Sequence, residues 1–190
     1  MEIVFEGIVL RPWELNDAAE LALIADNKKI ADNLRDGFPS PYSLRDAQDW
    51  LNLIIPENHP PRLFAITIDK KVVGNFGIVT KTNIYRKNVE IGFFVSEKFW
   101  GNGIATKSIR AGVSYAFETF DIVRVYAEVF SDNIASRKAL EKAGLKIEAT
   151  ILQNIIKNGI IKDSCIYSIL REDFNSRSGS WDLGACFSYL

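Results

Sequence analysis

Two glycines one residue apart, Gly101 and Gly103, stand between a run that alternates like a strand and a pattern that repeats like a helix. The stretch from Phe99 to Ser108 reads FWGNGIATKS. Glycine is a poor helix and strand former, so this junction needs bare backbone. A helix that starts here presents unpaired N–H groups and about half a positive charge. The turn therefore predicts either an anion-binding helix start at residues 101–106 or a plain tight connection.

The turn does not match the familiar nucleotide-binding motifs. A Walker loop needs lysine directly after its last glycine, and a dinucleotide fingerprint needs a third glycine where Thr106 stands. The glycines alone do not identify the ligand.

Hydrophobic periodicity predicts an α+β chain with a mixed sheet. Strands are expected at 7–13, 63–69, 72–80, 89–96, 123–130, 146–157 and 160–170. Helices are expected at 16–27, 28–34, 43–54, 104–120 and 133–144, and Ser43 with Asp46 resembles a capping box. Two hairpin turns are predicted, at Lys70-Lys71 and at Asn158-Gly159.

Composition narrows the class of protein. The chain has 190 residues, 47% of them hydrophobic, and a formal net charge of −1, which suits one globular domain and gives no support to nucleic-acid binding. No apolar stretch approaches the roughly 20 residues of a membrane span. Two cysteines, Cys165 and Cys186, have no metal-type spacing, so we expect no metal site and a reduced, cytoplasmic protein.

Two ordered motifs resemble the GNAT superfamily of N-acetyltransferases. The stretch Trp100 to Ala105 is similar to its pyrophosphate loop, [RQ]-x-x-G-x-[GA]. The later motif N-x-x-[SA]-x-x-x-[YL]-E-x-x-G-F is matched by Asn133, Ser136, Leu140, Glu141 and Gly144. The ends LRPWELNDAAELALIADN and KNGIIKDSCIYSILREDF look like the branch of ribosomal-protein N-terminal alanine and serine acetyltransferases. The resemblance covers residues 6–174.

This resemblance implies a fold and a domain organisation. The sheet would be mixed and mostly antiparallel, splayed at the acetyl-CoA site and flanked by helices. Residues 1–174 would form a single acetyltransferase domain. Residues 175–190, Ser/Gly-rich and then aromatic, would form a C-terminal tail that is either disordered or docked on the body or on a partner.

The resemblance also implies how acetyl-CoA, the co-substrate, is bound. Backbone groups of Phe93, Phe94 and Val95 would pair with the pantetheine arm, and Asn133 would contact that arm near the thiol. The pyrophosphate would rest on the amides of Gly101, Asn102, Gly103, Ile104, Ala105 and Thr106. Trp100 replaces the usual Arg or Gln, and we interpret it as a packing residue.

Acetyl transfer needs a neutral amine, so a general base should face the acetyl group. The candidates are two strand carboxylates, Glu128 and Glu90. Glu128 precedes Asn133 by five residues, where a related N-terminal acetyltransferase subfamily keeps its catalytic glutamate. Glu90 shares a strand face with Gly92 and Phe94. For both, an exposed or salt-bridged carboxylate is the alternative interpretation.

The departing CoA thiolate needs little help from a proton donor. The residue that would act as this donor is less well defined than the base. Leu140 stands where many family members have a tyrosine acid, which leaves Ser136 either as a proton donor or as a capping or surface serine. The ribosomal-protein branch tends to have an acid on the strand that here reads LQNIIKNG. No acid occurs on this strand here, which weakens the inference that this chain shares the substrate of that branch.

Other side chains are candidates for the acceptor cleft. Phe38, Pro39 and Tyr42 lie in the loop that caps this cleft in similar folds, and Asp163 and Tyr167 stand on the last strand. Each has packing as its alternative role.

The sequence predicts direct attack of a primary amine on acetyl-CoA, since no cysteine or serine stands in an obvious nucleophile setting. The first choice of acceptor is a protein or peptide α-amino group, because it loses its proton more readily than a lysine amine. The alternatives are a small-molecule amine, such as a polyamine, amino acid or antibiotic, and a non-catalytic acyl-CoA-binding protein. Either a monomer or a homodimer fits the sequence.

Overall fold

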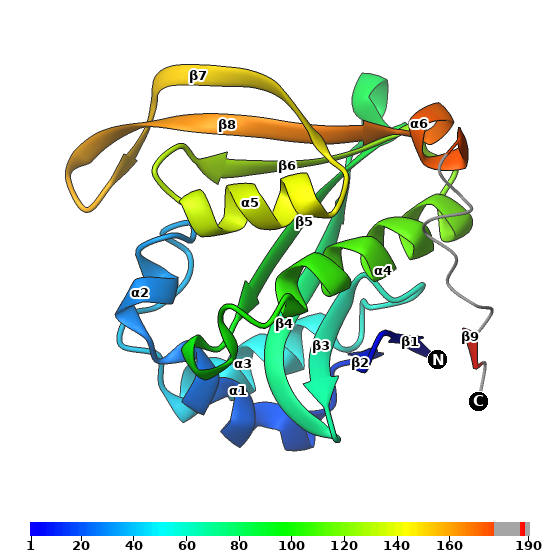
Figure 1. Ribbon diagram of the computed structural model, residues 1–190. Coiled ribbons are helices and arrows are strands. Elements are labelled where there is room, and N and C mark those ends of the chain that lie inside the picture. The colour runs from blue at the N-terminus through cyan, green and yellow to red at the C-terminus, as the bar shows by residue number, and fades with distance from the viewer. Residues whose placement is uncertain (177–186, 189–190) are drawn as a thin grey trace.

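The computed structural model describes residues 1–176 and the backbone of Phe187–Ser188 (Figure 1). The described strands form one sheet in the order β7-β8-β6-β5-β4-β3-β2-β1-β9. Neighbours run antiparallel except β5 and β6, which are parallel, so the predicted mixed, mostly antiparallel α+β fold is confirmed. The strands are β1 (Glu2–Phe5), β2 (Ile8–Pro12), β3 (Leu63–Ile68), β4 (Lys71–Thr80), β5 (Asn88–Val95), β6 (Arg124–Phe130), β7 (Lys146–Lys157), β8 (Ile160–Leu170) and β9 (Phe187–Ser188).

Helices cover both faces of the sheet. They are η1 (Leu15–Asp17), α1 (Ala18–Ala25), α2 (Lys28–Ala31), α3 (Leu44–Ile54), η2 (Asn83–Tyr85), η3 (Glu97–Phe99), α4 (Ile104–Thr119), α5 (Ile134–Lys142) and α6 (Arg171–Ser176). A larger core joins one sheet face to α4 and α5, and a smaller core joins the other face to α1 and α3. The predicted alternation of β5 is observed, because Ile91 and Phe93 pack in the larger core and Phe94 packs in the smaller one.

The parallel pair β5–β6 is short, and this opens the sheet. Residues 88–90 of β5 pair with residues 124–126 of β6, and the pairing stops there. Both strands continue beyond that point, to Val95 and Phe130. The backbone edges of their second halves therefore face a gap, as the predicted splay requires.

The hairpin of β7 and β8 contains a β-bulge. Ile151 pairs with Ser164 and Ile155 pairs with Lys162, so residues 152–154 of β7 oppose a single residue of β8, Asp163. The predicted turn at Asn158-Gly159 is confirmed by positive φ angles of 53° and 77°.

Two local predictions differ from the structure. The turn between β3 and β4 lies at Asp69-Lys70, with φ angles of 48° and 67°, whereas Lys71 already belongs to β4. Strand β1 was not expected, and it pairs with β2 through a tight turn at Glu6-Gly7.

Most of the expected C-terminal tail lies outside the described residues. Helix α6 runs to Ser176, and the backbone of Phe187–Ser188 pairs with β1 at the sheet edge. None of the described helices is long and apolar enough to cross a membrane.

Candidate active site

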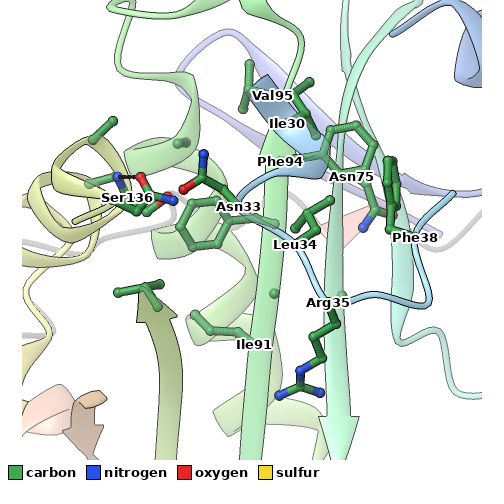
Figure 2. Close-up of a pocket in the computed structure, with 18 of the residues that line it drawn as sticks. Ile30, Asn33, Leu34, Arg35, Phe38, Asn75, Ile91, Phe94, Val95 and Ser136 are labelled. Carbon is green, nitrogen blue, oxygen red and sulfur yellow. Dashed lines mark hydrogen bonds between the residues drawn. The ribbon is translucent and has the colours of Figure 1, made fainter. Parts of the chain in front are cut away.

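A pocket of about 1030 Å³ opens where β5 and β6 separate (Figure 2). The start of α4 lies at one part of its wall, and the segment after α2 lies at another. Nearly all the predicted site residues line it: Glu90, Phe93, Phe94, Val95, Gly101, Gly103, Ile104, Ala105, Thr106, Glu128, Asn133 and Ser136. Asn102 is outside this lining, because its side-chain amide folds back onto the carbonyls of Phe99 and Trp100.

The glycine turn delivers free backbone amides to this pocket. Gly101 and Gly103 have φ angles of 81° and 74°, a conformation that L side chains rarely adopt. The first helical hydrogen bond of α4 runs from Lys107 N to Gly103 O, at 3.0 Å. The amides of Ile104, Ala105 and Thr106 therefore have no acceptor within the helix, and they form a place for an anion.

Fewer backbone groups are free along the edge of β5 than the sequence suggests. Ser96 N bonds to Val73 O on β4, so by alternation Phe93 and Val95 turn their backbone groups toward the gap. However, the Trp100 indole Nε1 donates to Val95 O at 2.6 Å. Trp100 thus binds the backbone carbonyl of Val95, one of those that the resemblance assigns to the pantetheine arm. The backbone carbonyl of Phe93 remains available to the arm.

Glu90 is held by cations from two segments. It is 8% exposed, and it forms ion pairs with Arg35 through Oε1 and with Lys81 through Oε2. The hydroxyl of Tyr126 lies 3.4 Å from Oε2. The hydrogen bond to Glu90 raises the pKa of Lys81. Both carboxylate oxygens therefore already have charged donors.

Glu128 has a different environment. Its Oε1 accepts hydrogen bonds from Ser164 Oγ at 2.6 Å and from Asn154 Nδ2 at 3.1 Å. Its Oε2 accepts none from the described residues, and the side chain is solvent-exposed. One oxygen is thus anchored, while the other has no donor among the described residues.

Asn133 and Ser136 stand together at the start of α5. Asn133 Oδ1 caps the helix by accepting from Ser136 N at 3.1 Å, so Ser136 is not the capping residue. The Ser136 hydroxyl makes no hydrogen bond within the described part of the chain. Leu140 is fully buried in the larger core and does not face the pocket.

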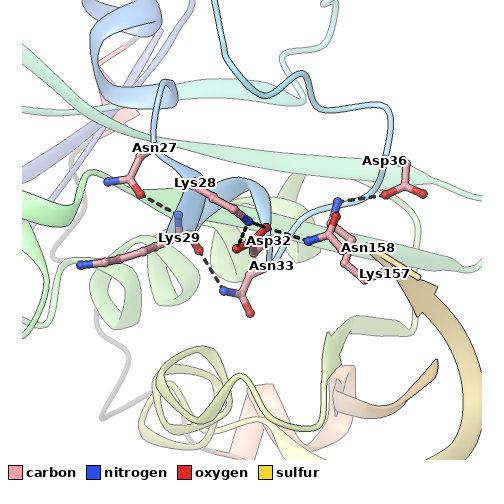
Figure 3. A network of polar contacts seen from close by, with 8 residues as sticks. All are labelled: Asn27, Lys28, Lys29, Asp32, Asn33, Asp36, Lys157 and Asn158. Atoms are coloured by element: carbon pink, nitrogen blue, oxygen red, sulfur yellow. Dashed lines mark hydrogen bonds and ion pairs between the residues drawn. The ribbon is translucent and has the colours of Figure 1, made fainter. Parts of the chain in front are cut away.

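The tip of the β7–β8 hairpin is attached to the segment around α2 (Figure 3). Lys157 Nζ pairs with Asp36 Oδ1 at 2.9 Å, and Asn158 Nδ2 donates to Asp32 Oδ1 at 2.9 Å. The Lys157 side chain is only 8% exposed. These bonds join two segments that border the pocket, since Ile155 of the hairpin and Arg35 of the α2 segment both line it.

Aromatic side chains line the pocket beside α2. The rings of Phe38 and Tyr42 are 4.9 Å apart, and Phe38 meets Phe94 of β5 edge-on at 5.8 Å. Phe38, Pro39 and Tyr42 all line the pocket, in the place that the sequence suggested.

Asp163 and Tyr167 have packing roles. Asp163 Oδ1 accepts from Gln153 N in the bulge, and the buried Tyr167 hydroxyl donates to Glu141 beneath α5. Neither lines the pocket. Within residues 1–176, no cluster of His, Cys, Asp and Glu is suited to a metal ion.

Sequence reasoning missed the partners of the two glutamates. Arg35 lies 55 residues from Glu90, and Asn154 and Ser164 lie 26 and 36 residues from Glu128. Lys81 is nearer, nine residues before Glu90 and directly after the neighbouring strand β4. Only the three-dimensional arrangement of the strands brings them together.

The splayed strands and the anion-accepting helix start define a protein that binds an extended, negatively charged co-substrate. The family model described as an acetyltransferase (GNAT) domain matches residues 8–146. The chain therefore belongs to the GNAT acetyltransferase family. It is an acyltransferase that acts on amines, acetyl-CoA is its co-substrate, and the non-catalytic alternative is set aside.

Individual proteins resemble the chain over most of its length. The probable N-acetyltransferase YjcK of Bacillus subtilis is 30% identical, covering 87% of this chain and 95% of that protein. The putative ribosomal N-acetyltransferase YdaF of Bacillus subtilis is 28% identical, covering 90% and 95%. The spermidine N(1)-acetyltransferase of Escherichia coli K12 is 22% identical, covering 85% and 86%.

A solved structure shares the fold. The ribosomal alpha-N-protein acetyltransferase RimL, in complex with coenzyme A, has a TM-score of 0.80 at 20% identity, covering 91% of this chain and 99% of that one.

Proposed function

We propose that the protein acetylates the N-terminal α-amino group of a peptide or protein, by direct attack of the amine on the acetyl-CoA thioester. The catalytic unit is residues 1–174. The buried free Cys165 fits a reducing compartment such as the cytoplasm. The single observation that carries the proposal is the free oxygen of Glu128 in a pocket that also holds the glycine turn.

The co-substrate fits the residues present. The amides of Ile104, Ala105 and Thr106 would hold the pyrophosphate, because they lack helical acceptors and Gly103 brings no side chain in front of them. The backbone of Phe93 would pair with the pantetheine arm along the gap. Asn133 would reach the arm near the thiol with its side-chain amide group.

Glu128 is the general base of this mechanism. Its Oε2 takes a proton from the acceptor ammonium, and the neutral nitrogen then forms the new bond to the acetyl carbonyl carbon as the carbon–sulfur bond breaks. The Ser136 hydroxyl, which has no partner among the described residues, would protonate the departing sulfur. The attacking nitrogen would lose its second proton as the amide forms, and that proton would restore the Ser136 hydroxyl. Glu90 serves the site differently, because its two cations occupy both oxygens.

The charge of the pocket favours a singly charged amine over a polyamine. Among the described lining residues, the acidic side chains are Asp46, Asp49, Glu90 and Glu128, and the basic ones are Lys29, Arg35, Lys138 and Lys142. Charges of both signs are therefore equal in number, and no acidic field is present to concentrate a polycation. The aromatic wall at Phe38 and Tyr42 suits an apolar first side chain.

A small-molecule amine is the second candidate. It is favoured by the likeness to a spermidine acetyltransferase along most of the chain. A panel that contains short peptides with free and with blocked N-termini, spermidine and single amino acids separates the two classes by kcat/KM.

The test of the base is Glu128→Gln, with Glu90→Gln as its matched partner. We expect Glu128→Gln to lower kcat by about 100-fold, the usual contribution of a general base, while acetyl-CoA affinity stays unchanged. Glu90→Gln should act mainly on stability. A Glu128→Gln enzyme with wild-type kcat would contradict the proposed mechanism.

A further inference from the structure

Two donors meet on a single oxygen of Glu128, and one of them, Asn154, comes from the β7 bulge. Asn154 Nδ2 donates to Glu128 Oε1 at 3.1 Å and to Ser164 Oγ at 2.9 Å, and Ser164 Oγ donates to the same Oε1 at 2.6 Å. These three side chains come from β7, β8 and β6, which are consecutive neighbours in the sheet. The arrangement fixes which way the carboxylate faces.

A regular strand would not bring Asn154 to this face. Ile151 and Ile155 pair with Ser164 and Lys162, which share one face of β8, so position 154 of a regular strand would point to the opposite face. On that opposite face Thr150 meets the buried Cys165. The bulge therefore re-aims Asn154 toward Glu128.

The bulge itself is stabilised by a neighbouring acid. Gln153 has a φ of 52°, and its N–H donates to Asp163 Oδ1 at 2.8 Å. The carbonyl of Asp163 accepts from Ser131 N, just beyond the end of β6, at 2.9 Å. Asp163 thus ties the bulge to the strand that carries Glu128.

We propose that Asn154 and Ser164 are positioning residues that anchor Oε1 of Glu128 and so keep Oε2 directed to the acceptor amine. This inference rests on the proposed function of Glu128 as the base. It accounts for the register shift between Ile151 and Ile155, beyond which the hairpin pairs regularly up to its turn. Glu128 and Ser164 line the pocket, whereas Asn154 does not.

The experiment measures kcat and both KM values for Asn154→Ala, Ser164→Ala and Asn154→Asp. Each alanine variant should lower kcat by about 10-fold, the size of one hydrogen bond to a charged group, with acetyl-CoA KM unchanged. Asn154→Asp should lose more, because it replaces a donor with a second negative charge. Leu152→Ala, an exposed side chain in the same bulge, is the control and should keep wild-type kcat.

A double variant separates positioning from a structural role. If Asn154 acts through Glu128, then adding Asn154→Ala to Glu128→Gln should cost no further activity. An equal loss in both backgrounds, or kcat of Asn154→Ala within about 2-fold of wild type, overturns the inference while Glu128 stays the base. If Glu128→Gln alone is fully active, both the inference and the proposed base fall.

Discussion

Glu90 and Glu128 lie on the same face of neighbouring strands, yet their surroundings differ. Glu90 pairs with Tyr126 in the parallel register, and Glu128 follows Tyr126 by two residues. One carboxylate is nearly buried between two cations, and the other is exposed with one oxygen free. We therefore expect Glu90 to contribute to stability and Glu128 to catalysis.

Replacing Glu90 tests this separation. Glu90→Gln leaves Arg35 and Lys81 without their counter-charge, so we expect the free energy of unfolding to fall by about 1–3 kcal/mol. Urea denaturation measures it, with Glu128→Gln as the matched control that should unfold like the wild type. Equal stability of the two variants would contradict the structural role of Glu90.

The sequence predicted which residues gather at the pocket better than it predicted what each one does. The glycine turn and the start of α5 are local motifs, so Gly103 and Asn133 could be placed from a few neighbouring residues. The choice between Glu90 and Glu128 depends on Arg35 and Asn154, which reach them from distant segments. Contacts of that kind leave no local signal.

At the scale of elements, the hairpin tip and the α2 segment together border the part of the pocket that we propose for the acceptor. The buried Lys157 links them through its ion pair with Asp36. Its partner is largely exposed, so the pair can be broken without opening the core. Breaking the ion pair between Lys157 and Asp36 therefore tests whether this link affects acceptor binding.

We expect Lys157→Met to raise the acceptor KM by about 5-fold and to leave the acetyl-CoA KM unchanged. The physical reason is that the α2 segment loses one of its two polar attachments to the hairpin, while the bond from Asn158 to Asp32 remains. Lys162→Met is the control, because Lys162 sits on the same hairpin but pairs with Asp132 instead. Steady-state kinetics at saturating acetyl-CoA measures the effect. A change confined to acetyl-CoA, or the same change in both variants, would argue against the bridge.

The boundaries of helices and strands were predictable from the sequence where capping and turn residues mark them locally. Ser43 and Asp46 form the predicted capping box of α3. The bulge in β7 was missed, because Leu152, Gln153 and Asn154 look like ordinary strand residues. The register of the two strands reveals it, together with the hydrogen bond from Gln153 N to Asp163.

At the scale of the whole molecule, the approach of α4 to the sheet sets the position of its first turn. A Cβ at Gly112 would lie 2.1 Å from the Phe76 ring of β4, so the helix comes unusually close there. Packing of this kind was not readable from the sequence, because Gly112 looks like a weak point in a helical pattern.

Gly112→Ala should therefore destabilise the protein by about 1–3 kcal/mol, although alanine is the better helix former. Gly37→Ala, where a Cβ meets nothing within 4 Å, is the control and should stay near wild type. Thermal unfolding of both variants measures the difference. A more stable Gly112→Ala protein would show that helix propensity outweighs the contact with Phe76.

The central claim is that the pyrophosphate of acetyl-CoA rests on the amides at the start of α4. Calorimetric titration of acetyl-CoA into the wild type, Gly103→Asp and Gly103→Asn tests it most directly. Both substitutions have similar size and tolerate positive φ, so they differ mainly in charge. We predict that Asp weakens binding by at least 10-fold more than Asn does, about 1.4 kcal/mol. Equal affinities for the two variants would place the anion elsewhere and contradict the account.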